Sequence, residues 1–454
     1  TPLYSSAASD VYKRQLIFNS KISQLHAQEN INLNQAINTA IQNNTSVSNL
    51  EKTLDIQKLS TSTAKGNLLP SLSLNANWSR NNTYSGGTVT FQNGVPILIS
   101  EQDSWINNFG LGLNTQVILF NGFSNLEQID LEKENESSVR INLDKEKYDI
   151  AYKVTAAYFD LLKKEKVLKA NEDNLLDSRS QLDKIKEYMN VGKKTISDVY
   201  KQDVLVAQNE LILERSKNEY SKSKVDLLLS MNTDINKEFT VSDNNISTEM
   251  SDAELQTILQ KNSNTEALLN EAIQKRYDYK YTQQNIKINQ VQYSIDKKNL
   301  YYPSISAFAR YNLNASRIDD IGKSRNFSFG FTLNYDLFQG FKLDNRAQAS
   351  EIAIKQKQDD LSQLQQQFRS DLKKSYIDLQ TSQKQIEILD RNIKASEQDK
   401  LLSEENYSVG FGTLLDVQTA GTKLNSLKID KINAFYDFLL AEKKLNYYTG
   451  DLTY

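Results

Sequence analysis

The sequence predicts a mainly helical protein with a smaller transmembrane β part, and three observations lead to this fold class. Only 15 Gly and 4 Pro occur among 454 residues, so turns are few and the elements between them are long. Two copies of the same motif order indicate a twofold internal repeat. Within each copy, short stretches that alternate apolar and polar residues interrupt long stretches of helical and heptad periodicity.

Composition restricts the function classes. The chain has 39% hydrophobic and 24% charged residues, with a mean hydropathy of -0.59. It contains no run of about 18 apolar residues, the length that a membrane-spanning helix needs, so any membrane crossing has to use strands. Its 54 basic and 57 acidic residues give a net charge of -3, which argues against a nucleic-acid partner.

Catalytic and cofactor chemistry has few candidate residues. The chain has no Cys, and His26 is its only His, so thiolate, metal and histidine acid–base sites lack their usual groups. Carboxylate or Tyr chemistry stays open, for example in a glycosidase with paired carboxylates. Because no glycine-rich phosphate loop or isolated acidic pair in an apolar setting supports it, we predict no cofactor, no metal and no enzyme activity.

The N-terminal residues differ from the rest of the chain. Residues 1–15 match neither the periodicity nor the composition that follows, and we exclude them as non-native sequence. Residues 16–27 are typical of the end of a secretory signal, with Leu25 and Ala27 at positions that permit cleavage before Gln28. The alternative is a frayed N-terminal segment. We therefore expect non-native sequence followed by a signal remnant over residues 1–27, and a mature protein that begins at Gln28.

The repeat divides the remaining chain into two copies. Its clearest marker is Phe120-Asn-Gly-Phe123, which Phe338-Gln-Gly-Phe341 repeats 218 residues later. Pro70 and Pro303, which begin matching segments, lie 233 residues apart instead, so the first copy holds about 15 extra residues near Gly86, where we expect a loop. We place the first copy at 28–231, an equatorial connector with little regular core at 232–263, and the second copy at 264–450.

Each copy contains two stretches with strand alternation, as where Phe327, Phe329 and Phe331 alternate with Ser328 and Gly330. A length of about 10 residues with one apolar and one polar face suits a tilted outer-membrane strand, and aromatic residues near both ends suit the two membrane interfaces. The alternatives are a soluble sheet of two hairpins packed on a helix, and aromatic residues that pack in a core. The predicted strands lie at about 70–80, 105–120, 303–314 and 326–338.

Long coiled coils follow the strands. One heptad row is formed by Val199, Val206, Leu213, Tyr220 and Leu227. The second copy repeats this row, with Lys431 as an interruption. We predict two antiparallel helical hairpins with tips at about 190–196 and 408–414, and the mixed charges on their outer faces indicate solvated surfaces.

Four amphipathic strands cannot close a barrel. An open sheet in lipid would leave the backbone groups of its edge strands unpaired, at a cost of several kcal/mol each. Several chains therefore have to share one barrel, and a homotrimer would supply twelve strands, an even number of the kind that outer-membrane barrels use. The sequence thus predicts a shared 12-stranded β-barrel joined to a long helical barrel of antiparallel coiled coils.

These motifs resemble those of the TolC family of outer-membrane efflux proteins over roughly residues 28–450. The resemblance rests on LLPSLSL and YYPSISA before the strands, LFNGF and LFQGF after them, and the tip motifs YMNVGKKTISDV and NYSVGFGTLLDV. It implies a trimeric channel-tunnel in the outer membrane whose helical part lies in the periplasm. It also implies passive exit in a tripartite efflux or type I secretion system, with a periplasmic adaptor and an inner-membrane pump or ABC exporter as partners.

Both hairpin tips combine a helix-ending glycine with a capping box. We expect Gly192 and Gly410 to take the left-handed conformation that ends a helix. Thr195 to Asp198 and Thr413 to Asp416 have the spacing of capping boxes that begin the returning helix, so helix capping alone could explain both carboxylates.

The resemblance implies functional roles at the same tips. It makes Asp416 one member of a carboxylate ring at the periplasmic constriction, with Tyr407 as a gate residue nearby. Gly412 stands where a gating Arg would lie and Thr419 where a second acidic residue would lie, so we expect the closed state to be held differently. For adaptor docking, unless these are ordinary helical turns, it points to Val191, Gly192, Thr195 and Asp198 in the first tip and to Val409, Gly410 and Thr413 in the second.

Two non-channel functions stay open on the residues alone: a soluble elongated coiled-coil scaffold and a periplasmic adaptor. An adaptor needs small β-rich domains on both sides of one hairpin, whereas this chain has two hairpins and four amphipathic strands. Because the sequence also has no GxxxxGK[ST] motif, we expect energy coupling to lie in a partner.

Overall fold

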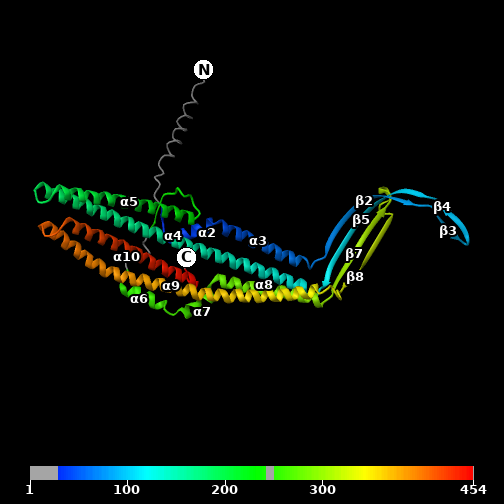
Figure 1. Cartoon of the computed structure of the whole chain (residues 1–454). Helices are drawn as coiled ribbons and strands as arrows, with labels where there is room; N and C mark the ends of the chain where they lie inside the picture. The colour runs from blue at the N-terminus through cyan, green and yellow to red at the C-terminus, as the bar shows by residue number, and fades with distance from the viewer. Residues whose placement is uncertain (1–28, 242–249, 453–454) are drawn as a thin grey trace, which may run out of the picture. The chain divides into compact units, whose positions relative to one another are not determined.

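A computed structural model describes residues 29–241 and 250–452 of the chain (Figure 1). Two compact units form within it: a hairpin unit, made of residues up to 49, 143–277 and from 365 onward, and a sheet unit, made of residues 50–142 and 278–364. Each unit therefore takes segments from both sequence repeats. The predicted non-native sequence and signal remnant at 1–27, with His26, lie outside the described residues.

The sheet unit contains an antiparallel sheet of four strands in the order β2-β5-β7-β8 (Figure 1). Their bounds are β2 Ser71–Ser85, β5 Gln102–Phe120, β7 Ser304–Ala315 and β8 Ser324–Asn334. The structure thus confirms a mainly helical chain with four long strands, two from each repeat. β2 and β5 are longer than predicted, because their pairing continues from Ser71↔Gln116 to Ser85↔Gln102, beyond the end of β7.

One face of this sheet is apolar and exposed. Leu72 and Leu74 of β2 are 71% and 70% exposed, and Phe329 and Phe331 of β8 are both 74% exposed. On the other face, asparagine side chains lie against backbone: a Cβ atom on Gly112 of β5 would approach the side chains of Asn75 and Asn312. The predicted alternation therefore separates a surface of large apolar side chains from one of glycine and amides.

Two strand predictions were wrong in detail. β8 ends at Asn334 rather than near residue 338, because its partner β7 begins at Ser304, directly after Pro303, and the pairing Ser304↔Asn334 is its last. The extra residues of the first repeat form a small hairpin rather than a loop, with strands β3 Thr88–Gln92 and β4 Val95–Ile99. Asn93 and Gly94 connect them with φ of 51° and 80°, the backbone that an Asn-Gly hairpin turn requires.

Sharp corners lead from the strands into the long helices. Both FxGF motifs make the same turn: Gly122 and Phe123 have φ of 66° and 63°, and Gly340 and Phe341 have φ of 62° and 63°. The rings of Phe120 and Phe123 meet edge to face at 5.3 Å, and the second motif repeats this contact at 5.5 Å. The duplicated motif therefore forms the same tight turn twice, each time directly before the start of a long helix.

The helical hairpins belong to the hairpin unit at their tips. The first pairs α4 Ser124–Asn190 with α5 Ile196–Ser230, and the second pairs α9 Lys342–Val409 with α10 Leu414–Thr449. Val199, Val206, Leu213 and Leu227 of the predicted heptad row are all buried, whereas Lys431 pairs with Asp390. Among the described residues, no helix is both long enough and apolar enough to span a membrane.

Shorter elements complete both units. They are β1 Glu29–Ile31, α2 Leu33–Asn43, α3 Thr45–Gly66, β6 Phe239–Val241, α6 Asp252–Lys261, α7 Thr265–Lys275, α8 Tyr277–Tyr301 and the 3-10 helix η1 Ile318–Asp320. The prediction of little regular core at 232–263 was wrong for its described part. β6 pairs in parallel with β1, which lies about 210 residues earlier, and Phe239 of β6 is completely buried. Leu255 of α6 is also buried, so this segment contributes apolar side chains to a core.

Candidate functional site

The two hairpin tips are the candidate site, and both end their first helix in the same way. Gly192 has φ of 75° and Gly410 has φ of 90°. The N–H of Lys193 donates to the carbonyl of Tyr188 at 2.8 Å, and the N–H of Phe411 donates to the carbonyl of Asn406 at 2.9 Å. These six-to-one bonds around a left-handed glycine are Schellman motifs, and a residue with a Cβ would be strained at either glycine.

Capping boxes begin both returning helices, as the threonine and aspartate spacing predicts. The backbone N–H of Thr413 donates to Asp416 Oδ2 at 2.9 Å, and its hydroxyl donates to the same oxygen at 2.7 Å. Thr195 makes the equivalent bonds to Asp198 Oδ2, at 3.2 Å and 2.9 Å. Each carboxylate therefore caps the start of its own helix. Because the two capping boxes make the same bonds, a variant of one box can serve as the control for a variant of the other.

Asp416 keeps its charge over a wider pH range than an ordinary aspartate. The hydroxyl and the backbone N–H of Thr413 both donate to its carboxylate and lower the pKa of Asp416. The side chain is exposed at the tip, so the negative charge is accessible to solvent ions. Three such carboxylates brought near one axis would form a site that attracts cations.

Tyr407 lies inside the tip rather than on its surface. It is 3% exposed and belongs to an apolar cluster that both hairpins share, together with Leu175, Leu182, Ile185, Val199, Val206, Leu213, Leu414 and Val417. Burial, and then the charge of Asp198, raise the pKa of Tyr407 to about 12. Its ring therefore packs between the two hairpins.

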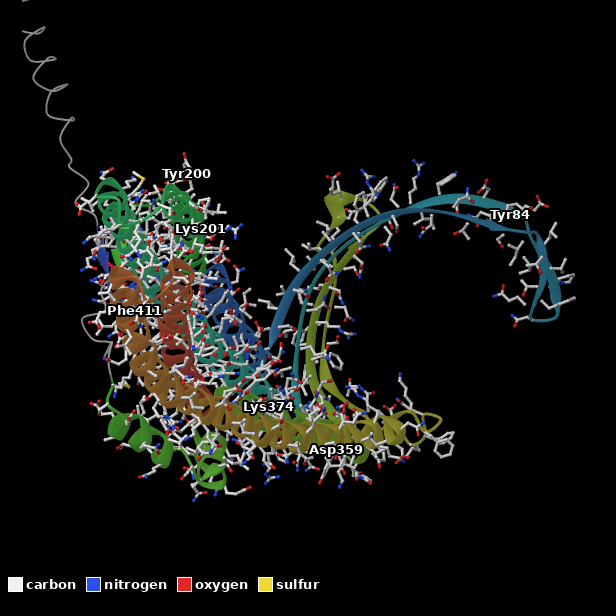
Figure 2. All side chains as sticks on the ribbon, turned by 60° about the vertical axis from the view of Figure 1, so that its left-hand side comes forward. Tyr84, Tyr200, Lys201, Asp359, Lys374 and Phe411 are labelled. Carbon is white, nitrogen blue, oxygen red and sulfur yellow. The ribbon has the colours of Figure 1, made fainter. Side chains whose placement is uncertain are left out.

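The predicted docking residues are mostly exposed. Val191 and Val409, one in each tip, are both 68% exposed, and Phe411 is 90% exposed (Figure 2). Exposed apolar side chains of this size at a helix turn offer a contact surface that ordinary turns of polar residues do not. The side chains of Thr195 and Thr413 are engaged in the capping boxes, so only their backbone and methyl groups are available for docking.

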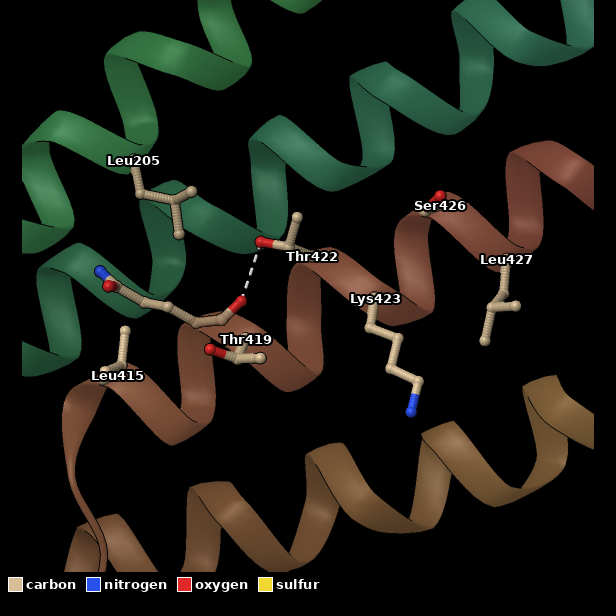
Figure 3. A pocket seen from close by; sticks show the side chains of 8 residues that line it. Leu205, Leu415, Thr419, Thr422, Lys423, Ser426 and Leu427 are labelled. Carbon is tan, nitrogen blue, oxygen red and sulfur yellow. Dashed lines mark hydrogen bonds between the residues drawn. The ribbon is translucent and has the colours of Figure 1, made fainter.

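An open groove of about 570 Å³ runs beside the tips, between α5 and α10. It is lined by Leu205, Leu415, Gln418, Thr419, Thr422, Lys423, Ser426 and Leu427 (Figure 3). Thr419, where a second acidic residue was considered, contributes a neutral hydroxyl to this groove. Among the described residues, no group of three His, Cys, Asp or Glu side chains could hold a metal ion.

Sequence reasoning missed the side chains that connect the hairpins. Gln202 of α5 is 1% exposed and donates to the Ser178 carbonyl at 3.0 Å, and its oxygen accepts from Gln418 of α10 at 3.0 Å. Lys194 of the first tip contacts Tyr407 of the second. The 218-residue offset offers one signal for this lysine, because it pairs Lys194 with Gly412, where the second repeat has no side chain.

Comparisons with known proteins agree with this arrangement. The profile of the family described as outer membrane efflux protein matches residues 36–233 and 268–451. Among solved structures, CusC has a TM-score of 0.76 at 14% identity, with 92% of each chain covered. VceC from Vibrio cholerae has a TM-score of 0.72 at 17% identity, covering 92% of this chain and 96% of VceC.

A third structure extends the same likeness. The CmeC outer membrane channel from Campylobacter jejuni has a TM-score of 0.73 at 14% identity, covering 92% of this chain and 86% of that one. No curated protein sequence matches the chain. At these identities the likeness to solved structures establishes the fold alone, whereas the match to the family profile identifies the family.

Proposed function

The chain belongs to the outer membrane efflux protein family, and from that premise we propose that three copies form one channel for passive exit from the periplasm to the exterior. As a family member it is an outer-membrane transport protein of the TolC type, with a periplasmic helical part. The trimer, the shared barrel and the partners are the parts that we propose.

The observation that carries the proposal is the four-stranded sheet with an exposed apolar face. β2 and β8 are its edge strands, and neither has a second partner among the described residues. In lipid, each unpaired backbone group on these edges would cost several kcal/mol, so the edges have to meet other edges. Pairing β2 of one copy with β8 of the next would close the sheet, and three copies would give twelve strands.

The exposed tips support docking to a periplasmic adaptor. Val191, Val409 and Phe411 present apolar side chains to solvent, and left-handed glycines hold the backbone of each tip in a fixed turn. We propose that Gly192, Thr195 and Asp198 in the first tip, and Gly410 and Thr413 in the second, contribute backbone shape to this surface. The adaptor would connect the channel to an inner-membrane pump or ABC exporter, which would supply the energy.

The gate proposal assigns different tasks to two residues. Threefold symmetry would bring three Asp416 carboxylates near one axis, where their charge selects and holds cations. Tyr407 is buried between the hairpins, so its contribution would be to keep the tips together rather than to block the passage directly.

The deciding experiment is the mass of detergent-extracted protein from outer-membrane fractions, followed by planar-bilayer recording. A protein mass near three times 51.8 kDa, together with discrete single-channel currents, is expected. A water-soluble monomer without a membrane fraction would overturn the channel. A trimer that carries no current would agree with the proposed assembly but would overturn the proposed passive channel.

A further inference from the structure

Arg310 is the only charged residue on the polar face of the four long strands, all of whose residues the structure describes. Side chains alternate between the two faces of a strand. The register therefore places on the polar face the odd-numbered residues of β2 and the even-numbered residues of β5, up to its bulge after Ile118, and of β7 and β8. Apart from Arg310 these residues are uncharged, and most are Ser, Asn, Gln or Gly. The other charged residues of the four strands have the opposite alternation: Arg80, Asp103 and Arg325.

An aromatic ring supports the guanidinium of Arg310. Its Cζ lies 4.8 Å from the centroid of the Phe308 ring, two residues earlier in β7. A Cβ atom on Gly330 of the neighbouring strand β8 would come within 3.2 Å of Cζ of Phe308, so the ring lies where the glycine leaves space. A guanidinium held against a ring still presents the N–H donors at its edge to a ligand. The three residues together therefore present one oriented cation on a neutral surface.

The charge of Arg310 has no counter-ion on this face. Its register partners are Asn114 of β5 and Ser328 of β8, and both are neutral. The amide of Asn114 already donates to Asn75 Oδ1 at 2.5 Å. No Asp or Glu occupies the polar face of the described strands, and Arg310 is exposed. An exposed guanidinium that no carboxylate neutralises attracts anions, and its fork of donors matches carboxylate, phosphate and sulfonate groups.

We propose that three Arg310 side chains form an anion-attracting ring inside the shared barrel, which binds chloride and the acidic groups of passing organic anions. This inference rests on the proposed function, since the residues form a ring only if three sheets close with their polar faces inward. Ala309 and Tyr311, the neighbours of Arg310 in β7, lie on the apolar face. The ring would thus lie at a level that lipid surrounds, where low-dielectric walls strengthen the field of a fixed charge in the passage.

The sheet offers a matched control for an ion-selectivity measurement. Arg310→Gln removes the charge from the polar face, whereas Arg325→Gln removes one from the apolar face of the neighbouring strand. Reversal potentials of single channels in a potassium chloride gradient give the permeability ratio of chloride to potassium. We expect Arg310→Gln to lower this ratio by about threefold, the size of a screened Coulomb attraction over a few ångströms of water. Arg325→Gln should leave the ratio unchanged, and Arg310→Lys should retain most of it. Equal ratios in Arg310→Gln and the wild type would overturn the ring.

A labelling measurement tests the same charge without any current. Ser328 lies opposite Arg310 in the β7–β8 pair, and Ser328→Cys would be the only thiol in a chain without Cys. In membrane-embedded protein, the measured quantity is its rate of modification by a sulfonate-bearing thiol reagent, divided by the rate for an ammonium-bearing reagent of similar size. We expect this quotient to fall by about threefold when Arg310→Gln is added, and to stay the same with Arg325→Gln. An unchanged quotient would overturn anion attraction at Arg310. A quotient that falls in a protein without current would support anion attraction but overturn the passive channel, and with it the ring.

Discussion

Replacing the capping threonine of the second tip tests whether its aspartate has a task beyond capping. Thr413→Ala removes the hydroxyl that donates to Asp416 Oδ2 at 2.7 Å and accepts from the Asp416 N–H at 3.3 Å. Only the backbone N–H of residue 413, at 2.9 Å, would still hold the carboxylate. We therefore expect the first turn of α10 to fray and Asp416 to become less ordered.

The size of the effect follows from the lost cap. An N-cap threonine replaced by alanine costs about 1 kcal/mol, which corresponds to a change of about fivefold in the local opening equilibrium. Thr195→Ala is the matched control, because Thr195 makes the same bonds to Asp198 in the first tip. The rate of amide hydrogen exchange should rise by about this factor in the first turn of α10 for Thr413→Ala, and in the first turn of α5 for Thr195→Ala.

Planar-bilayer recording distinguishes a carboxylate ring from an aspartate that only caps its helix. If Asp416 belongs to a carboxylate ring, Thr413→Ala should weaken the block of the channel by divalent cations, and Thr195→Ala should not. If both variants change exchange in their own helix and leave cation block equally unaffected, Asp416 only caps its helix. Unchanged exchange in both variants would refute the capping argument itself.

Three further predictions concern the same tips. Asp416→Ala should reduce cation block and raise leak in single-channel recordings, whereas Asp198→Ala should not; equal responses would contradict the ring. Burial raises the pKa of Tyr407 from 10.0 to about 12, so the unfolded state loses this proton first and the free energy of unfolding should fall as pH rises across that range. Unfolding titrations of Tyr407→Phe should show a smaller fall, and an identical one would contradict the burial argument. Gly410→Val places a β-branched residue at φ of 90° and should weaken export in cells, with undiminished export counting against a docking role.

Much of the fold could be predicted because its signals are local. Heptad spacing identified the long helices, and alternation identified all four strands of the main sheet. Threonine and aspartate three positions apart identified both capping boxes. The β3–β4 hairpin was missed although Asn93-Gly94 is a strong turn signal between apolar stretches, because the glycines at 86 and 87 suggested a loop.

The site was only partly predictable, because the partner of each side chain lies far away in the sequence. Tyr407 was predicted from the resemblance to lie near a gate, and the structure adds that its ring is buried in an apolar cluster that both hairpins share. Gln202 occupies a buried position where heptad reasoning expects no polar residue, and its bonds to Ser178 and Gln418 make that position favourable. A sequence pattern shows that a residue faces a core, but not which hairpin supplies the other half of that core.

The sequence by itself determined where helices, strands, corners and caps occur, because each depends on residues within a few positions of one another, as at Gly410 and Thr413. The tertiary structure alone decided that Lys194 contacts Tyr407, because these residues are 213 positions apart and meet only where the two hairpins pack at their tips. Packing also decided that a lone strand, β6, pairs with β1 across the chain. Such contacts form only after the loops between their partners close, so no local pattern encodes them.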